Sequence, residues 1–292
     1  MRIVYIYKRS NGTDGQSIFD EKLLESLSRV SEVRGIPVNG ERRGWPFWVR
    51  KLSKGDIELI GSITPHDLVI VSHESLLGLL KYIFCHIFII HNHIPISRIA
   101  GILGVAYRIG SANVFNLIWE KSEKVAVLSH RESRMESRDT ILLTPGFNDR
   151  PSELIDGIGV LNSNGWLLKK LNRLESNQFY YLLNEFGRIV NSISCQYLLI
   201  EDRFDMGFKL KLLQGLYSSV IIYSFVDLTE EITSRGLSAD NFILVNDIDD
   251  IKRIAISENR INTYKQNKRL IERDFSWELA ANTIVTNLNE YI

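Results

Sequence analysis

The sequence is poor in cysteine, in net charge and in long apolar runs. Its two cysteines, Cys85 and Cys195, lie far apart and show none of the spacings of a zinc site or a disulfide framework. The 35 basic and 35 acidic residues cancel, and no basic cluster marks a nucleic-acid surface. These absences predict a cytoplasmic protein with no nucleic-acid partner and no cofactor.

No segment has the length and hydrophobicity of a membrane span. The longest apolar stretch, residues 76–90, carries Lys81 and His86 and is shorter than the roughly 18–20 residues that a helix needs to cross a bilayer. The apolar run at residues 1–7 is too short for a signal peptide and predicts a strand. Residues 42–51 combine tryptophans with basic groups, so they could either pack into a core or rest on a membrane surface. Peripheral association with the inner face of the cell membrane therefore stays open.

Short apolar segments alternate with helical patterns along the chain. This alternation predicts an α/β protein of the Rossmann-like class, in which ligands bind beyond the carboxyl ends of parallel strands. Strands are expected at 2–7, 67–72, 87–91, 124–129, 157–161, 197–200, 220–223 and 242–245, and helices at 17–31, 102–119, 167–174, 178–189 and from 209.

Turn-forming residues gather at 142–151, which is typical of a domain junction, and the strand–helix alternation restarts at 157. A chain of 292 residues is long enough for two domains, each with its own core. We therefore expect one Rossmann-like domain over 1–150, a second over 151–275, and a final helix over 276–292 that could pack back on the first domain.

The segment 206–216 predicts an anion-binding site. A glycine turn precedes a helix whose first residues include Lys209 and Lys211, and a buried strand follows. The first backbone N–H groups of a helix lack partners within the helix, and the helix dipole is positive at that end. Lysines there are unfavourable for the helix itself, so they indicate a phosphate ligand. A solvated helix start is the alternative.

Five short motifs follow one another along the chain. They are the loop 11–15, the strand end 90–93, the junction 144–148, the segment 207–215 and residues 273–278. Their order is that seen in GT-B glycosyltransferases, and most of the chain resembles that group. The pattern is similar to the large retaining family of mannosyl- and glucosyltransferases of polysaccharide assembly, and the KLLQ segment resembles the glucuronosyltransferases of xanthan-type exopolysaccharide pathways.

The resemblance implies two Rossmann-like domains facing a cleft, with a UDP- or GDP-sugar donor on the second domain and a glycan or lipid-linked acceptor on the first. The residues that it assigns to the donor are Gly207, Phe208, Lys209, Leu210, Lys211 and Gln214. Lys211 would contact the diphosphate. Gln214 stands where the more widespread pattern has a glutamate, and Met206 stands at the place of another.

Histidines that end a predicted strand are the first candidates for a catalytic base, because a histidine can accept a hydroxyl proton near neutral pH. His91 and His93 end the strand at 87–91, just before Pro95. Glu120 is a further candidate, at a place where related chains often carry an acidic residue. His73 and Glu74, which follow another strand, are weaker alternatives. Each of these side chains could instead be solvated or hold a strand end.

Two further regions complete the predicted site. The loop with Gly12, Thr13, Asp14 and Gly15 follows the first strand, so its backbone could approach an acceptor or a diphosphate. It lacks the spaced glycines of a dinucleotide-binding loop, which argues against an NAD-dependent oxidoreductase. Arg98 could contact an acceptor phosphate.

A metal site is not expected. Residues 247–250 contain the letters of a DxD motif, but they follow a late strand and predict the start of a surface helix. The sequence thus predicts a metal-independent hexosyl- or glucuronosyltransferase that extends a polysaccharide or a lipid-linked glycan. The alternative is a non-catalytic GT-B-like subunit that supports a partner enzyme, which the missing glutamates and a short second domain would suit.

Overall fold

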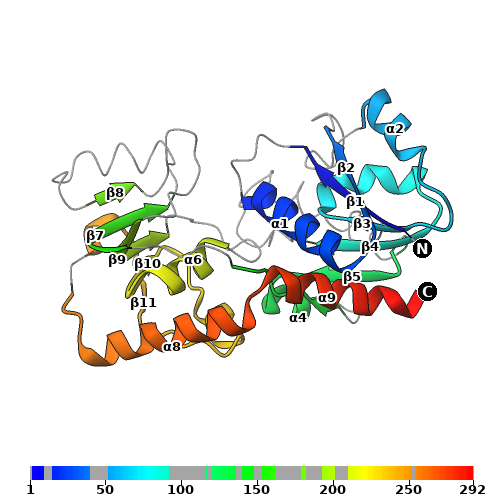
Figure 1. The fold of residues 1–292 in the computed structure, drawn as a ribbon. Coiled ribbons are helices and arrows are strands. Elements are labelled where there is room, and N and C mark those ends of the chain that lie inside the picture. The colour runs from blue at the N-terminus through cyan, green and yellow to red at the C-terminus, as the bar shows by residue number, and fades with distance from the viewer. Residues whose placement is uncertain are drawn as a thin grey trace. The chain divides into compact units, whose positions relative to one another are not determined.

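The structure is a computed structural model that describes residues 2–9, 15–39, 52–91, 116, 120, 122–135, 140–147, 153–161, 179–181, 193–200, 210–251 and 254–291. These residues form two compact units (Figure 1). The first unit takes the described residues up to Gly146 and those from Trp277 onward, and the second takes those from Phe147 to Ser276. Each unit is built on one parallel sheet, so the predicted α/β class is confirmed.

The first unit has a six-stranded sheet in the order β2-β1-β3-β4-β5-β6, with every described pair parallel. Its strands are β1 Ile3–Lys8, β2 Val33–Val38, β3 Leu68–Val71, β4 His86–His91, β5 Lys124–Val127 and β6 Ile141–Leu142. Its helical elements are α1 Gly15–Val30, α2 Lys54–Ile60, η1 Glu74–Tyr82, α4 His130–Met135, α9 Trp277–Leu288 and η5 Asn289–Tyr291.

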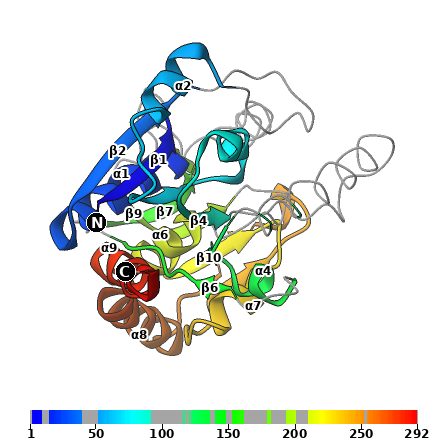
Figure 2. The same ribbon diagram turned by 90° about the vertical axis from the view of Figure 1, so that its right-hand side faces the viewer.

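Both faces of this sheet are apolar, as expected for a parallel sheet covered by helices. On one face, Val4 and Ile6 join a buried cluster with residues of α2 and η1. Because side chains alternate along a strand, Tyr5 belongs to the other face, where α1 brings its buried Leu23 and Leu27. Helix α2 lies beside β2 (Figure 2).

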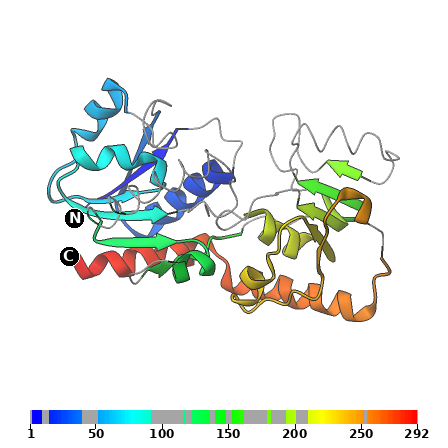
Figure 3. The same ribbon diagram turned by 180° about the vertical axis from the view of Figure 1, so that it is seen from behind.

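The C-terminal helix α9 belongs to the first unit, where it packs along α1 and near β5 (Figures 1 and 3). Its first residue, Trp277, meets the ring of Phe19 edge-on at 5.4 Å between centroids. Trp277 also fills the space beside Gly146, where any Cβ would overlap the tryptophan backbone. Lys124 on β5 pairs with Glu290 at 2.8 Å. These contacts attach the end of the chain to its beginning.

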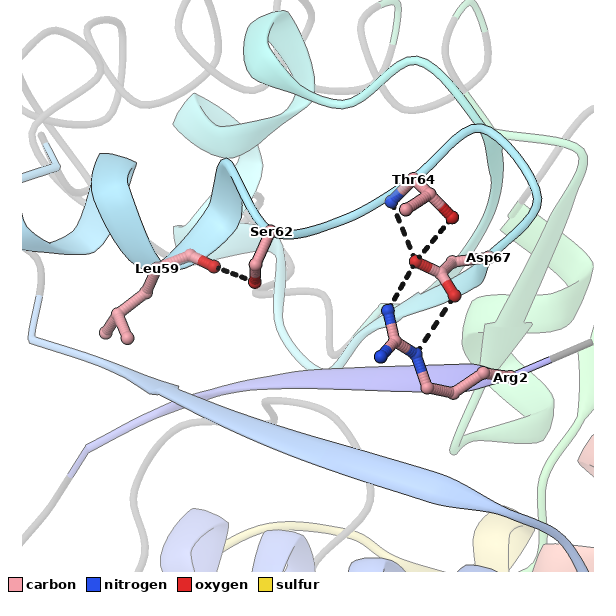
Figure 4. A network of polar contacts seen from close by, with 5 residues as sticks. All are labelled: Arg2, Leu59, Ser62, Thr64 and Asp67. Carbon is pink, nitrogen blue, oxygen red and sulfur yellow. Dashed lines mark hydrogen bonds and ion pairs between the residues drawn. The ribbon is translucent and has the colours of Figure 1, made fainter.

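A polar network ties the start of β1 to the start of β3 (Figure 4). Asp67 accepts two hydrogen bonds from Arg2, at 3.1 and 2.8 Å, and two from Thr64, at 2.7 and 3.0 Å. In the same region Ser62 donates to the carbonyl of Leu59, one turn before it. The four donors around Asp67 compensate for its burial.

The second unit has a five-stranded parallel sheet in the order β11-β10-β9-β7-β8. Its strands are β7 Glu153–Leu161, β8 Phe179–Tyr181, β9 Ile193–Ile200, β10 Ile221–Ser224 and β11 Phe242–Leu244. Its helical elements are α6 Leu210–Ser218, α7 Thr229–Thr233, η4 Ile248–Asp250 and α8 Glu258–Asp274. None of the helices in the described ranges of the chain is long and apolar enough to cross a membrane.

Two predicted helices need correction. The helix expected at 178–189 is wrong at its start, because Phe179–Tyr181 forms β8 and pairs with β7; aromatic side chains suit a pleated sheet better than a helix. The surface helix expected at 247–250 is a single 3₁₀ turn. Most of the helix expected at 102–119 and all of that at 167–174 lie outside the described residues, as do residues 42–51.

Candidate functional site

The two sheets share one topological feature that points to ligand binding. In each, the first strand lies between the second and the third, so the chain reverses direction across the sheet at that strand. Ligands of parallel α/β sheets bind beyond the carboxyl ends of the strands at such a switch point. In the first unit the point lies beyond Lys8 and Val71, and in the second it lies beyond Leu161 and Ile200.

Helix α6 begins at the switch point of the second unit, because it connects the end of β9 to the start of β10. A helix that links two parallel strands runs back across the sheet, so its first turn lies at the carboxyl edge. That first turn holds Leu210 and Lys211, both partly exposed. The backbone N–H groups at this end and the lysine charge can together hold a phosphate.

The body of α6 is fixed against the sheet. Gly215 faces β9, where an added Cβ would lie 2.8 Å from the side chain of Leu198. This close approach lets the helix bury nearly its whole length. The buried apolar residues of α6 are Leu212, Leu213, Leu216 and Tyr217.

Tyr217 connects the end of α6 to the rest of the second unit. Its hydroxyl donates to Glu272 on α8 at 2.9 Å, and the ammonium of Lys268 lies 4.7 Å from its ring centroid. Its ring also packs against Phe147, with 4.4 Å between centroids. Because α6 is anchored at this end, the position of its first turn in the second unit is fixed.

Gln214 is a second polar residue of α6, and it is 4% exposed. Its backbone carbonyl accepts a hydrogen bond from Ser218, which involves no side-chain atom of the glutamine. A carboxamide near the start of this helix is a candidate ligand-binding group, because it offers both hydrogen-bond donors and an acceptor. It lies three residues after Lys211, on the same side of the helix.

The other predicted donor residues, Gly207, Phe208 and Lys209, lie outside the described residues. So do Gly12, Thr13, Asp14, His93 and Arg98 of the first unit. Gly15 is the first residue of α1.

The sheet register brings two predicted histidines to the same level. His91 is the last residue of β4, and His73 follows the end of β3 by two residues. Val71 is paired with Ile89, so the same register continued by two residues places position 73 level with position 91. Adjacent strands are about 4.8 Å apart, which makes these two positions neighbours at the carboxyl edge. Glu74, next in the chain, begins η1.

Glu120 is placed differently from the histidines. It is helical and exposed, and it comes four residues before the start of β5. A residue that precedes a strand belongs to the opposite edge from residues that follow strands. His130, which the sequence reasoning missed, follows the end of β5 and begins α4. The predicted strand at 124–129 was enough to identify His130, because a residue that directly follows this strand lies at the same edge of a parallel sheet as His91.

A buried carboxylate supports the first unit close to its switch point. Asp20 on α1 is 2% exposed and accepts hydrogen bonds from the Tyr5 hydroxyl at 2.8 Å and from Gln16 at 3.1 Å. Burial, followed by the nearby charge of Asp20, raises the pKa of Tyr5 well above its usual value, so Tyr5 is a hydrogen-bond donor at neutral pH. The pair ties the second turn of α1 to β1. Asp20 was also missed, although its spacing from Leu23, Leu24 and Leu27 marks it as inward-facing.

The acidic residues at 247–250 have a structural use. Asp247 and Asp250 form a reciprocal cap around η4, in which each carboxylate accepts backbone N–H groups of this turn. At the end of β10, Asp227 likewise accepts from the backbone N–H of Thr229, which lowers the pKa of Asp227 and fixes the start of α7. Within the described part of the chain, no three His, Cys, Asp or Glu side chains converge as metal ligands.

No family model matches the sequence, and a search of curated proteins finds no match. Solved structures match over nearly the full length. The N-terminal domain of trehalose-6-phosphate phosphatase from Candida albicans has a TM-score of 0.60 at 10% identity, with 100% of this chain and 97% of that chain covered. Trehalose-6-phosphate synthase from Burkholderia multivorans has a TM-score of 0.57 at 10% identity, with 99% and 96% covered.

The glycosyltransferase SnogD from Streptomyces nogalater is also similar, with a TM-score of 0.51 at 11% identity and coverage of 98% of this chain and 100% of that chain. These likenesses rest on arrangement rather than on sequence, because the identities are near 10%. The chain therefore has the GT-B fold that the sequence motifs predicted.

Proposed function

We propose that the protein is a glycosyltransferase that moves a sugar from a nucleoside-diphosphate sugar to a polysaccharide or a lipid-linked glycan. The observation that carries the proposal is the start of α6 at the switch point of the second unit, where Lys211 is partly exposed and Gln214 follows one turn later. An amide and a cation on one side of a helix N-terminus suit a sugar diphosphate, which offers hydroxyl groups and negative charge together.

The fold agrees with this proposal, since glycosyltransferases are among the structures that the chain resembles. The chemistry of glycosyl transfer also agrees with the proposal. Glycosyl transfer requires stabilisation of the departing diphosphate, which a helix N-terminus and a lysine provide without a metal. It also requires a positioned acceptor hydroxyl and often a base, for which His91 is the first candidate. We propose UDP- or GDP-sugars as donors and a hexosyl or glucuronosyl group as the sugar transferred.

A thermal-shift experiment tests the donor site. UDP, GDP and other common nucleoside diphosphates are added to the protein in the presence of EDTA, and the melting temperature is measured. A ligand at about 100 times its dissociation constant adds about 2.7 kcal/mol to the stability of the native state, so one of them should raise the melting temperature by several degrees. An unchanged melting temperature with every diphosphate would favour a non-catalytic subunit that supports a partner enzyme.

A further inference from the structure

The second unit contains a cavity of about 470 Å³ that lies along one side of helix α8. The described residues that line it all belong to α8: Asn262, Lys265, Gln266, Arg269 and Leu270. Spacings of three and four residues place them on a single side of the helix. Cavities of about 300–1,000 Å³ are the size of typical small-molecule sites. The cavity is therefore a candidate binding site apart from the start of α6.

The opposite side of α8 holds the helix on the second unit (Figure 1). Its buried residues are Thr263, Asn267 and Ile271, one turn apart. The side-chain amide of Asn267 donates to the carbonyl of Ser238 and accepts from the N–H of the same residue, at 2.8 Å each. Because this side is fixed, the four polar residues of the cavity lining point outward, and each of them is exposed.

Lys265 and Arg269 give the lining its charge, and they lie one turn apart. Neither forms an ion pair within the described part of the chain, whereas Arg273, one turn further on, pairs with Asp274 at 2.6 Å. Two like charges at this spacing repel each other, and an anion held between them removes that cost. The two cations are therefore candidate contacts for a negatively charged group.

The carboxylates of α8 do not cancel this charge. The helix carries five cations and three carboxylates, and none of the three carboxylates is in the described lining. Asp274 is already paired, and Glu272, the nearest to the lining in sequence, accepts a hydrogen bond from the hydroxyl of Tyr217 at 2.9 Å. Glu258 lies seven residues before Lys265, which is about 10 Å along the helix axis. Positive charge thus prevails beside the cavity.

A phosphate monoester matches this lining. It carries a charge of about −1.5 to −2 at neutral pH, which two cations balance. The carboxamides of Asn262 and Gln266 can donate to phosphate oxygens and accept from hydroxyl groups. Leu270 is partly buried, and within the described chain none of the large exposed apolar residues belongs to α8, so this side of the helix is not suited to a bilayer. We propose that the cavity binds a small soluble phosphate monoester whose carrier bears hydroxyl groups.

The test uses the full chain without nucleotide, and two pairs of probes. Glycerol 3-phosphate and ribose 5-phosphate are compared with their neutral counterparts, glycerol and methyl β-D-ribofuranoside, by saturation-transfer NMR. At least one phosphate should bind, at least fivefold more tightly than its neutral counterpart. Its binding should weaken between pH 7 and pH 5, because the second pKa of a phosphate monoester is about 6 while lysine and arginine side chains keep their charge.

Substitutions then locate the site. Lys265→Gln and Arg269→Gln should each weaken phosphate binding at least fivefold, because each removes one of the two cations. Lys54→Gln, which changes an exposed lysine of α2 in the first unit, should leave it unchanged. Circular dichroism checks that each variant is folded.

The proposal is overturned if neither phosphate binds, if the neutral probes bind as tightly, or if Lys265→Gln and Arg269→Gln leave binding unchanged. Loss of phosphate binding in Lys211→Ala but not in Arg269→Gln would place the ligand at the start of α6 and would also overturn it. Vesicles of phosphatidylcholine with phosphatidylglycerol test the lipid alternative. Binding to these vesicles without binding of either soluble phosphate would assign the cations to a lipid surface and reject the proposal.

Discussion

Asp20 in the first unit and Gln214 in the second are both buried polar residues near a switch point, but they differ in charge and in their surroundings. One carboxylate oxygen of Asp20 accepts hydrogen bonds from Tyr5 and Gln16, which join α1 to β1. Gln214 follows Lys211 by one turn on α6, whose first turn is partly exposed. A carboxylate repels a diphosphate, whereas a neutral carboxamide can donate hydrogen bonds to it. We therefore expect a structural role for Asp20 and a binding role for Gln214.

Substitutions in the two units should also affect different steps of the proposed reaction. If His91 is the base, His91→Ala should slow sugar transfer about 10²–10⁴-fold, because proton removal from the acceptor would lose its catalyst. Nucleotide affinity should stay the same, since the proposed donor-binding residues belong to the second unit. The measurement is steady-state transfer with a labelled donor, beside the thermal shift with nucleoside diphosphate. His66→Ala, an exposed histidine before β3, is the control.

An unchanged rate in His91→Ala would move the search to His73 and His130, which the sheet places at the same edge. If all three variants transferred sugar at the parent rate, the reaction would need no histidine of this edge as a base.

The contrast between Asp20 and Gln214 can be tested directly by stability. Asp20→Ala should lower the free energy of unfolding by about 2–4 kcal/mol, because it leaves the buried Tyr5 hydroxyl without its acceptor. Gln214→Met, of similar volume, should change it by less than about 1 kcal/mol without ligand. Urea denaturation measures both, with separate midpoints if the units unfold in separate steps.

A double-mutant cycle with Tyr5→Phe sharpens this test. If Asp20 acts through Tyr5, Asp20→Ala should cost less in the Tyr5→Phe background than in the parent. Should Gln214→Met prove as destabilising as Asp20→Ala, the amide would have a structural partner and the assignment of Gln214 to a ligand would fail.

Removing the proposed contact between Lys211 and the diphosphate should have a smaller effect, on ligand affinity in the second unit. Lys211→Ala should weaken nucleoside diphosphate binding by about 1.5–3 kcal/mol, the range of a single charge-assisted hydrogen bond. The matched control is Arg273→Ala, which removes an exposed cation from α8 of the same unit. Calorimetric titration of both variants measures the difference. Equal affinities would show that Lys211 is an ordinary solvated lysine of a helix start.

Sequence patterns predicted the central strands well, because buried parallel strands are continuous apolar runs. They did not predict β2 and α8, in which the apolar pattern is interrupted by glycine, proline or buried polar residues. Strand β2 contains Gly35 and Pro37, which a strand tolerates here because β2 lies at the edge of its sheet. Helix α8 was missed because two of its three buried residues, Thr263 and Asn267, are polar. Asn267 is held by two hydrogen bonds to the backbone of Ser238, so burial there does not require an apolar side chain.

For the site, the sequence located α6 and the histidine strand end, since both follow from strand–helix order and from a recognisable motif. It could not show that Gln214 is buried, or that Asp20 accepts hydrogen bonds from Tyr5 and Gln16, because both facts depend on how helices pack. It also could not align His73 with His91, since they lie 18 positions apart and meet only through the register of β3 with β4.

The smallest predicted effect concerns the opposite edge of the first unit, where no ligand is proposed. The Arg2 side chain, then the N–H and hydroxyl of Thr64, lower the pKa of Asp67 against the opposing effect of burial. A carboxylate whose folded pKa is depressed stabilises the fold above its unfolded pKa of about 3.9, and this contribution is lost as pH falls through the folded pKa. Asp67→Asn should therefore lower stability at pH 7 by about 1–2 kcal/mol, a value reduced because Arg2 is one-third exposed. Urea denaturation of parent and variant between pH 7 and pH 3 should show the difference shrinking toward acid, with nucleoside diphosphate binding unchanged at pH 7. A difference that stays constant with pH would mean that the geometry of the side chain, rather than its charge, holds β1 to β3.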